Sequence, residues 1–374
     1  MTVSEDELRE RLAAIEDPLV GEDIVSMGLV NDVRVDDGTA SISLAFNTPY
    51  APAELEIGQA IRDVVADAGL EPDLYAEAGA DHGFDEEVMP NVRNVIAVAS
   101  GKGGVGKTTV AANLAAGLEQ LGARVGLLDA DIHGPNAPRV LPVESDPGIT
   151  PDEKLAPPTA DGVKVMSMSF LIGEQDDPAI LRGPMVNNVM THFFENVEWG
   201  ALDYLVVDLP PGTGDASLDL LQTLPVAGVV IVTTPQQMAV DDARKGLRLF
   251  TKHNTPVLGI VENMSAYHCP NCGDVHDPFG RGGAAEICED YGIELLGSLP
   301  IHEDFGADGS ADPVVKDADS PVREPTRELV ADVADRIGEI NRRKVAGLLE
   351  VGDPTDEGEP DGPSPTEPGP GPKL

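Results

Sequence analysis

The segment Gly101–Thr108, Gly-Lys-Gly-Gly-Val-Gly-Lys-Thr, constrains the fold of this chain more than any other feature. It fits the phosphate-binding pattern G-x-x-x-x-G-K-[ST], follows the apolar run Asn94–Ser100 and opens the helical pattern Lys107–Leu121. A glycine-rich loop between a strand and a helix lets backbone N–H groups point at phosphate oxygens, and the helix N-terminus adds partial positive charge. The sequence therefore predicts an ATP-binding P-loop rather than a glycine-rich turn without a ligand.

The side chains of this loop have separate expected roles. Lys107 is expected to neutralise the β- and γ-phosphates, and the Thr108 hydroxyl to hold Mg²⁺. The residues predicted to bind the nucleotide are Gly101, Lys102, Gly103, Gly104, Val105, Gly106, Lys107, Thr108 and Thr109.

From residue 92 to about 345, short apolar β-branched runs alternate with helical patterns. The predicted strands are Val95–Ala99, Arg124–Asp129, Tyr204–Asp208, Gly228–Thr233, Pro256–Glu262 and, more weakly, Leu295–Ser298. The predicted helices are Lys107–Leu121, Val240–His253, Gly282–Tyr291 and Glu324–Arg343. Continuous apolar strands alternating with helices are typical of a parallel sheet covered on both faces. We expect a doubly wound, mostly parallel α/β sheet.

The segments on either side differ in composition. Residues 1–85 have helical patterns at Glu5–Ile15 and Ala53–Ala68 and a strand pair at Leu29–Val35 and Ala40–Phe46, which predicts a small α+β domain. Residues 86–91 are expected to be a linker to the domain at 92–345. Residues 346–374 are rich in Pro, Gly and acids without an apolar period, which predicts a disordered tail.

Acidic residues end two of the predicted strands. Tyr204–Asp208 is an apolar strand closed by Asp208, which we expect to hold Mg²⁺ through water, and the following Leu209–Asp215 segment has the composition of a γ-phosphate-sensing switch. Asp129 ends the strand after the P-loop helix, and Asp131 follows two residues later. A solvated loop acid is the alternative in a chain with 66 acids, and Asp208 fits it least because an acid closing a buried strand needs a compensating cation.

The three cysteines of the chain, Cys269, Cys272 and Cys288, cannot form a fully paired disulfide framework. Cys269-Pro-Asn-Cys272 indicates metal or redox chemistry. Two copies of the pair would give the four thiolates of a [4Fe–4S] cluster. One chain could instead bind Zn²⁺ through Cys269, Cys272 and His276 with His268 or Cys288. A redox dithiol is disfavoured because the pair does not open a helix, and Cys288, in an apolar helical stretch, is expected to be a core residue.

The charge balance excludes two classes of partner. With 25 basic and 66 acidic residues the net charge is −41, which repels nucleic acid and anionic membranes. The acids are scattered rather than clustered, which favours a surface adapted to high salt, and hence a halophilic source, over an acidic protein acting on basic partners. No apolar run is long enough to span a bilayer and the N-terminus is acidic, so a cytoplasmic location is expected.

The early lysine of the loop, Lys102, makes the motif resemble the deviant Walker A loop of the MinD, ParA and nitrogenase iron-protein group. That resemblance implies that Lys102 reaches the nucleotide of the facing subunit in a homodimer, and that Asp131 orients the attacking water with Asp129 in support. It also implies that Asn263 hydrogen-bonds the adenine edge, although a turn-forming Asn is an equal alternative.

The segments SGKGGVGKTTVAANLA, LLDADIHGPN, LVVDLPPGTGD, ENMS and CPNCG occur in this order, and residues 92–340 resemble the Mrp/ApbC family of iron–sulfur cluster carrier ATPases. The resemblance implies a homodimer that holds a labile [4Fe–4S] cluster between Cys269 and Cys272 of both chains. It further implies cluster exchange with an assembly scaffold and apo iron–sulfur proteins, gated by ATP.

Residues 1–80, with DPLVGEDIVSMGLVNDV, resemble the small iron–sulfur assembly domain often fused to these ATPases. That domain commonly carries a cysteine where this chain has Ala51, so here it is expected to be a docking or scaffold module. The alternatives are a MinD/ParA-like positioning ATPase, which needs a basic surface that this sequence lacks, and a zinc-stabilised nucleotide-binding interaction protein.

Overall fold

The computed structural model describes residues 3–48, 50–76, 89, 91–132, 134–170, 196–212, 214–269, 271–306 and 313–348. Most of the linker predicted at 86–91, and all but the first residues of the tail predicted at 346–374, lie outside the described residues.

The N-terminal domain is a three-stranded sheet packed against two helices. Its elements are α1 (Glu5–Leu12), β1 (Val30–Asp36), β2 (Thr39–Leu44), α2 (Pro52–Asp67) and β3 (Glu71–Ala76). β1 and β2 are antiparallel, as predicted, and turn through Asp37 and Gly38 with positive φ angles of 44° and 85°. β3 pairs in parallel with β2 and was not predicted, because its acids and its proline weaken the strand pattern.

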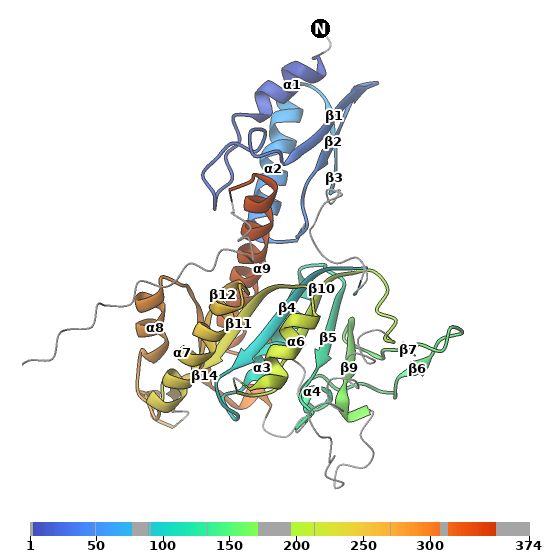
Figure 1. The fold of residues 1–374 in the computed structure, drawn as a ribbon. Coiled ribbons are helices and arrows are strands. Elements are labelled where there is room, and N and C mark those ends of the chain that lie inside the picture. Colours follow the sequence, from blue (N-terminus) through green and yellow to red (C-terminus); the bar gives the residue numbers. More distant parts are fainter. Residues whose placement is uncertain are drawn as a thin grey trace, which may run out of the picture.

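The second domain is built on one large sheet, in the strand order β13-β12-β11-β4-β10-β5-β9-β8 with β14 beside β12 (Figure 1). Its strands are β4 (Val92–Ser100), β5 (Val125–Asp129), β8 (Thr159–Ala160), β9 (Val163–Ser167), β10 (Leu202–Asp208), β11 (Val226–Thr233), β12 (Val257–His268), β13 (Val275–His276) and β14 (Leu295–Ile301). All neighbours pair in parallel except β8 and β13 at the ends. The predicted doubly wound, mostly parallel fold is confirmed.

Helices cover both faces of this sheet. They are α3 (Lys107–Gln120), α4 (Ala137–Val140), α6 (Asp215–Thr223), α7 (Gln237–Lys252), α8 (Gly283–Tyr291) and α9 (Arg323–Val345), with short 3₁₀ turns at Met168–Phe170, Glu303–Phe305 and Val314–Lys316. A small hairpin, β6 (Gly148–Ile149) and β7 (Leu155–Ala156), projects from the large domain on the side of β9 (Figure 1).

Successive side chains of each central strand alternate between two cores, as the pleat requires. In β4, Ile96 and Val98 belong to the core under α3 and α9, whereas Val95 and Ala97 belong to the core under α6, α7 and α8. This double burial explains why the strands are continuously apolar in the sequence.

Helix α9 joins the two domains. It begins over the large sheet and ends beside α2 of the N-terminal domain (Figure 1). Its Arg342 is fully buried and pairs with Asp17 Oδ2 at 2.5 Å and with Glu54 Oε1 at 3.3 Å, both in the N-terminal domain. Thr48 Oγ1 also donates to Glu54 Oε1, at 2.5 Å. A buried arginine with two carboxylates fixes the relative position of the domains, because separating them would strand these charges.

Ala51, which the sequence analysis singled out, lies inside this contact. Ala51 is fully buried and belongs to the core cluster of the large domain. Tyr50 next to it packs over Gly122, at the end of α3. Ala51 is therefore a packing residue of the domain interface.

Candidate nucleotide and metal site

The P-loop connects β4 to α3 and depends on its glycines. Gly104 and Gly106 have positive φ angles of 78° and 85°, a conformation that favours glycine. A β-carbon on Gly106 would overlap the Asn263 side chain, and one on Gly101 would overlap the backbone of Asp242. The loop is thus closely enclosed by neighbouring segments on two sides.

Three residues predicted for this site meet at the end of the loop. Lys107 Nζ pairs with Asp208 Oδ1, and Thr108 Oγ1 donates to Asp208 Oδ2 at 2.7 Å. Lys107 and Asp208 are both buried, and burial raises the pKa of the Asp208 carboxyl while the Lys107 ammonium opposes that shift. A cation, a hydroxyl and a carboxylate gathered at a helix N-terminus are the groups required to hold a phosphate with its divalent metal.

Asp129 organises the loop that follows β5. It is fully buried; Oδ2 accepts from Ala137 N at 2.9 Å and from Ser167 Oγ at 3.0 Å, and Oδ1 accepts from Asp131 N at 3.2 Å. Burial and the nearby Asp208 raise the pKa of Asp129 to about 6. Asp131 is nearly buried, and its Oδ1 accepts from Gly134 N at 3.1 Å. Ser167 was not predicted, because no local motif marks it.

The segment predicted to be a switch contacts the end of β4 and the start of the P-loop. Gly212 N donates to Ser100 O at 2.8 Å, and Gly212 has a positive φ of 92°. Pro211 beside it packs toward Gly103. A shift of this segment would therefore displace the first residues of the phosphate loop. Thr213 lies outside the described residues.

The Lys102 side chain reaches the residue that precedes α7. Its Nζ donates to Gln236 Oε1 at 3.2 Å, and Ser100 Oγ donates to its carbonyl at 3.0 Å. In the first turn of α7, Met238 is 74% exposed, an unusual state for a large apolar side chain. Gln236 was not predicted, since it lies 134 residues from Lys102 in the sequence.

Asn263 lies against the P-loop itself. Its Nδ2 donates to Val105 O at 2.9 Å, and the side chain is buried. The preceding Glu262 accepts from Ala284 N at 2.9 Å and so holds the first turn of α8. Both residues belong to β12, which continues past the sheet edge to His268 and ends one residue before Cys269.

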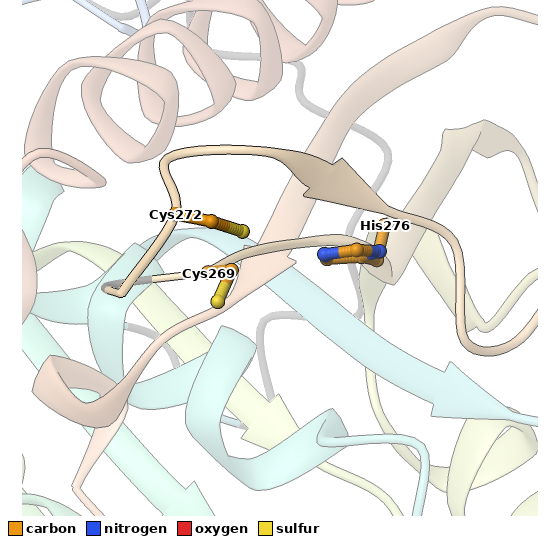
Figure 2. Close-up of side chains that lie close together, drawn as sticks. All are labelled: Cys269, Cys272 and His276. Atoms are coloured by element: carbon orange, nitrogen blue, oxygen red, sulfur yellow. The ribbon is translucent and has the colours of Figure 1, made fainter.

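The CxxC pair lies on the turn between β12 and β13 (Figure 2). Atoms of Cys269, Cys272 and His276 that can bind a metal all lie within 4.8 Å of one another. Cys272 and His276 are exposed and Cys269 is partly so. Backbone N–H groups of Cys272 and Asn271 lower the pKa of the Cys269 thiol.

Cys288 is a core residue, as predicted. It is buried on α8 in the core beneath α7 and α8, and burial raises the pKa of its thiol to about 11. Neither Cys288 nor His268 belongs to the metal-ligand group found among the described residues. The four-ligand zinc site predicted as an alternative within one chain therefore has three of its members together.

None of the described helices combines the length and the apolarity that crossing a bilayer requires.

Comparison with known proteins places both domains. Residues 91–336 match the family model of the NUBPL iron-transfer P-loop NTPase, and residues 5–71 match that of an iron–sulfur cluster assembly protein. An iron–sulfur cluster carrier protein of Synechocystis is 40% identical over 87% of this chain and 96% of its own length. One of Deinococcus radiodurans is 38% identical over 92% and 98%.

Among solved structures, a nucleotide-binding protein from Archaeoglobus fulgidus, in complex with ADP and with cobalt, is 41% identical. It covers 59% of this chain and 86% of its own, with a TM-score of 0.52.

Proposed function

Because this chain belongs to the iron–sulfur cluster carrier family of P-loop NTPases, we propose that it binds and hydrolyses ATP to time the transfer of a labile [4Fe–4S] cluster to apo-proteins. The cluster is then the group that the protein transfers, and ATP binding or hydrolysis controls when the transfer occurs.

One observation carries the proposal: the nucleotide loop and the thiols are linked by a single strand. Asn263 of β12 is bonded to the P-loop carbonyl of Val105, and the chain reaches Cys269 six residues later. Tyr267 and His268 pair with β13, and Asn263 and Tyr267 pair with β14, with a register irregularity between them where Met264 has a positive φ of 58°. A movement of the P-loop around phosphate would therefore reach the thiols through one strand that is hydrogen-bonded at both ends of this stretch.

The nucleotide chemistry follows from the residues at the loop. Lys107 would neutralise the phosphates, while Thr108 and Asp208 would hold Mg²⁺, and Asp131 would orient the attacking water. Asn263 would bond the adenine edge with its amide oxygen, since its nitrogen is engaged with Val105 O. Asp129 supports this arrangement by fixing the backbone between β5 and α4.

Binding a [4Fe–4S] cluster through these thiols requires a homodimer. One chain brings two thiols together at Cys269 and Cys272, and a [4Fe–4S] cluster takes four thiolates. Both thiols are at least partly exposed, so a second copy can approach them. Lys102, with the exposed Met238 near its partner Gln236, would lie at the same dimer interface and reach the facing nucleotide.

The N-terminal domain would serve as the docking module for the assembly scaffold or the recipient proteins. Its buried contacts with α9 hold it in a fixed position, so a bound partner would be presented to the ATPase domain in one orientation. The three free cysteines suit the reducing cytoplasm, and the scattered acids suit a halophilic cell.

Anaerobic reconstitution with iron and sulfide tests this function. We expect one cluster per two chains, with the absorption of a [4Fe–4S] cluster, lost in Cys269→Ser and in Cys272→Ser and retained in Cys288→Ser. Stoichiometric zinc in freshly purified protein together with no cluster uptake would instead support a zinc-stabilised interaction protein.

A further inference from the structure

The CxxC hairpin carries a third side chain that the cluster does not require. His276 lies on β13, opposite Tyr267 of β12. Its ring lies alongside the thiols in Figure 2, and one of its nitrogens is within 4.8 Å of both sulfur atoms. A four-thiolate cluster shared by two chains leaves both copies of this imidazole without a ligand role.

We propose that each subunit by itself binds one divalent thiophilic metal ion through Cys269 Sγ, Cys272 Sγ and His276, with the fourth coordination position open. The ion would be of the Fe²⁺, Co²⁺ and Zn²⁺ class, which prefers thiolate and imidazole ligands in tetrahedral geometry. The inference shares its two thiolates with the proposed function. It adds a second occupant, bound by a monomer and dependent on His276.

The spacing of the three groups fits such an ion. Metal–sulfur and metal–nitrogen bonds of about 2.3 and 2.0 Å place tetrahedral ligand atoms roughly 3.5 Å apart. The donor atoms here lie within 4.8 Å of one another, on exposed or partly exposed side chains of one short hairpin. The hairpin backbone is held by two hydrogen bonds, from Cys269 N to Asp274 O and from Gly273 N to Cys269 O, both at 2.9 Å. Rotamer changes of the three side chains can therefore bring the donor atoms closer without moving the backbone.

Charge favours the same occupant. Two thiolates and a neutral imidazole carry a charge of about −2, which a divalent ion neutralises without further groups. The net charge of −41 concentrates cations around the whole protein.

The fold also explains why Cys288 and His268 do not belong to this metal-ligand group. Cys288 is packed in the core. His268 pairs with Val275, so it lies on the hairpin face opposite to that of Tyr267 and His276. His268 is therefore a matched control: an imidazole next to Cys269 in sequence that points to the other face.

Titration of the reduced full-length protein with Co²⁺ tests the site. We expect one Co²⁺ per chain, with sulfur-to-metal charge-transfer bands and tetrahedral ligand-field bands, in protein that elutes as a monomer without nucleotide. His276→Ala should weaken Co²⁺ binding by roughly tenfold or more and shift the ligand-field bands, since loss of a ligand costs at least as much as loss of its supporting partner. His268→Ala should bind Co²⁺ like the native protein.

Equal Co²⁺ affinity and spectra for the native protein and His276→Ala would overturn the inference, as would uptake only by a dimer. Iron–sulfide reconstitution of His276→Ala separates the two proposals. If that variant takes up a cluster and the substitution leaves Co²⁺ affinity unchanged, only this inference fails. If Co²⁺ binding needs His276 but no chain takes up a cluster, the proposed function fails and this inference stands.

Discussion

Replacement of Lys107 by Ala gives a direct measure of how the P-loop holds phosphate. Lys107 is 6% exposed and pairs with Asp208, which is 0% exposed. Removing the ammonium deletes its charge-assisted bonds to the phosphates, while Asp208 and Thr108 remain to hold Mg²⁺. A hydrogen bond to a charged group contributes about 1.5–3 kcal/mol, Lys107 would make one to each of the β- and γ-phosphates, and each 1.4 kcal/mol is tenfold in affinity. We therefore expect Lys107→Ala to raise the Kd for Mg-ATP by about two to four orders of magnitude.

Isothermal titration calorimetry with Mg-ATP measures this effect, and Lys102→Ala is the matched control. Lys102 belongs to the same loop, but its ammonium is directed at Gln236 and not at Asp208. Lys102→Ala should therefore keep nearly the native Kd in the monomer while lowering kcat and ATP-dependent dimerisation. Thermal unfolding monitored by circular dichroism checks that both variants fold.

A Kd for folded Lys107→Ala within threefold of the native value would refute the assignment of phosphate binding to this lysine. Equal and mild effects of the two substitutions on binding and on turnover would refute the separate role of Lys102 in trans.

Three further predictions concern the domain contact and the strand between the sites. Arg342→Leu should lower the free energy of unfolding by about 3 kcal/mol or more at pH 8 in urea titrations, because it strands two buried carboxylates; an effect below about 1 kcal/mol would contradict this. Burial raises the pKa of Glu54 from 4.5 to about 7, so its contribution to stability is complete below pH 4.5 and is lost as the pH rises to about 7. Glu54→Gln should flatten that part of the urea-derived stability profile, and an unchanged profile would exclude Glu54 as its source. Asn263→Ala should leave cluster uptake intact but abolish the effect of Mg-ATP on cluster transfer; retained nucleotide dependence would show that β12 is not the link.

Local patterns predicted the parts of the fold that depend on neighbouring residues. Short segments were enough to predict the P-loop, the buried strand ending at Asp208 and the parallel sheet. In each of these segments the residue types are typical of one kind of structure. Cys288 was assigned to the core from its apolar helical surroundings, and the structure confirms it. The short elements β9 and α6 were missed, since few residues carry their pattern.

Contacts between distant segments could not be predicted in the same way. Arg342 meets Asp17 across 325 positions of the chain, and a single arginine in an exposed-looking helix gives no signal of a buried ion pair. Gln236 near Lys102 and Ser167 near Asp129 are similar cases. The approach of His276 to the thiols depends on the pairing of β12 with β13, which only the fold specifies.

The rate of [4Fe–4S] transfer to an apo-ferredoxin, followed anaerobically by the absorbance or circular dichroism of the recipient, tests the central claim most directly. We predict that reconstituted native protein transfers its cluster at a rate that changes severalfold when Mg-ATP is added, and that Lys107→Ala transfers at one rate with or without it. Transfer that is equally fast with and without Mg-ATP in the native protein, or no transfer at all from cluster-loaded protein, would contradict an ATP-timed cluster carrier.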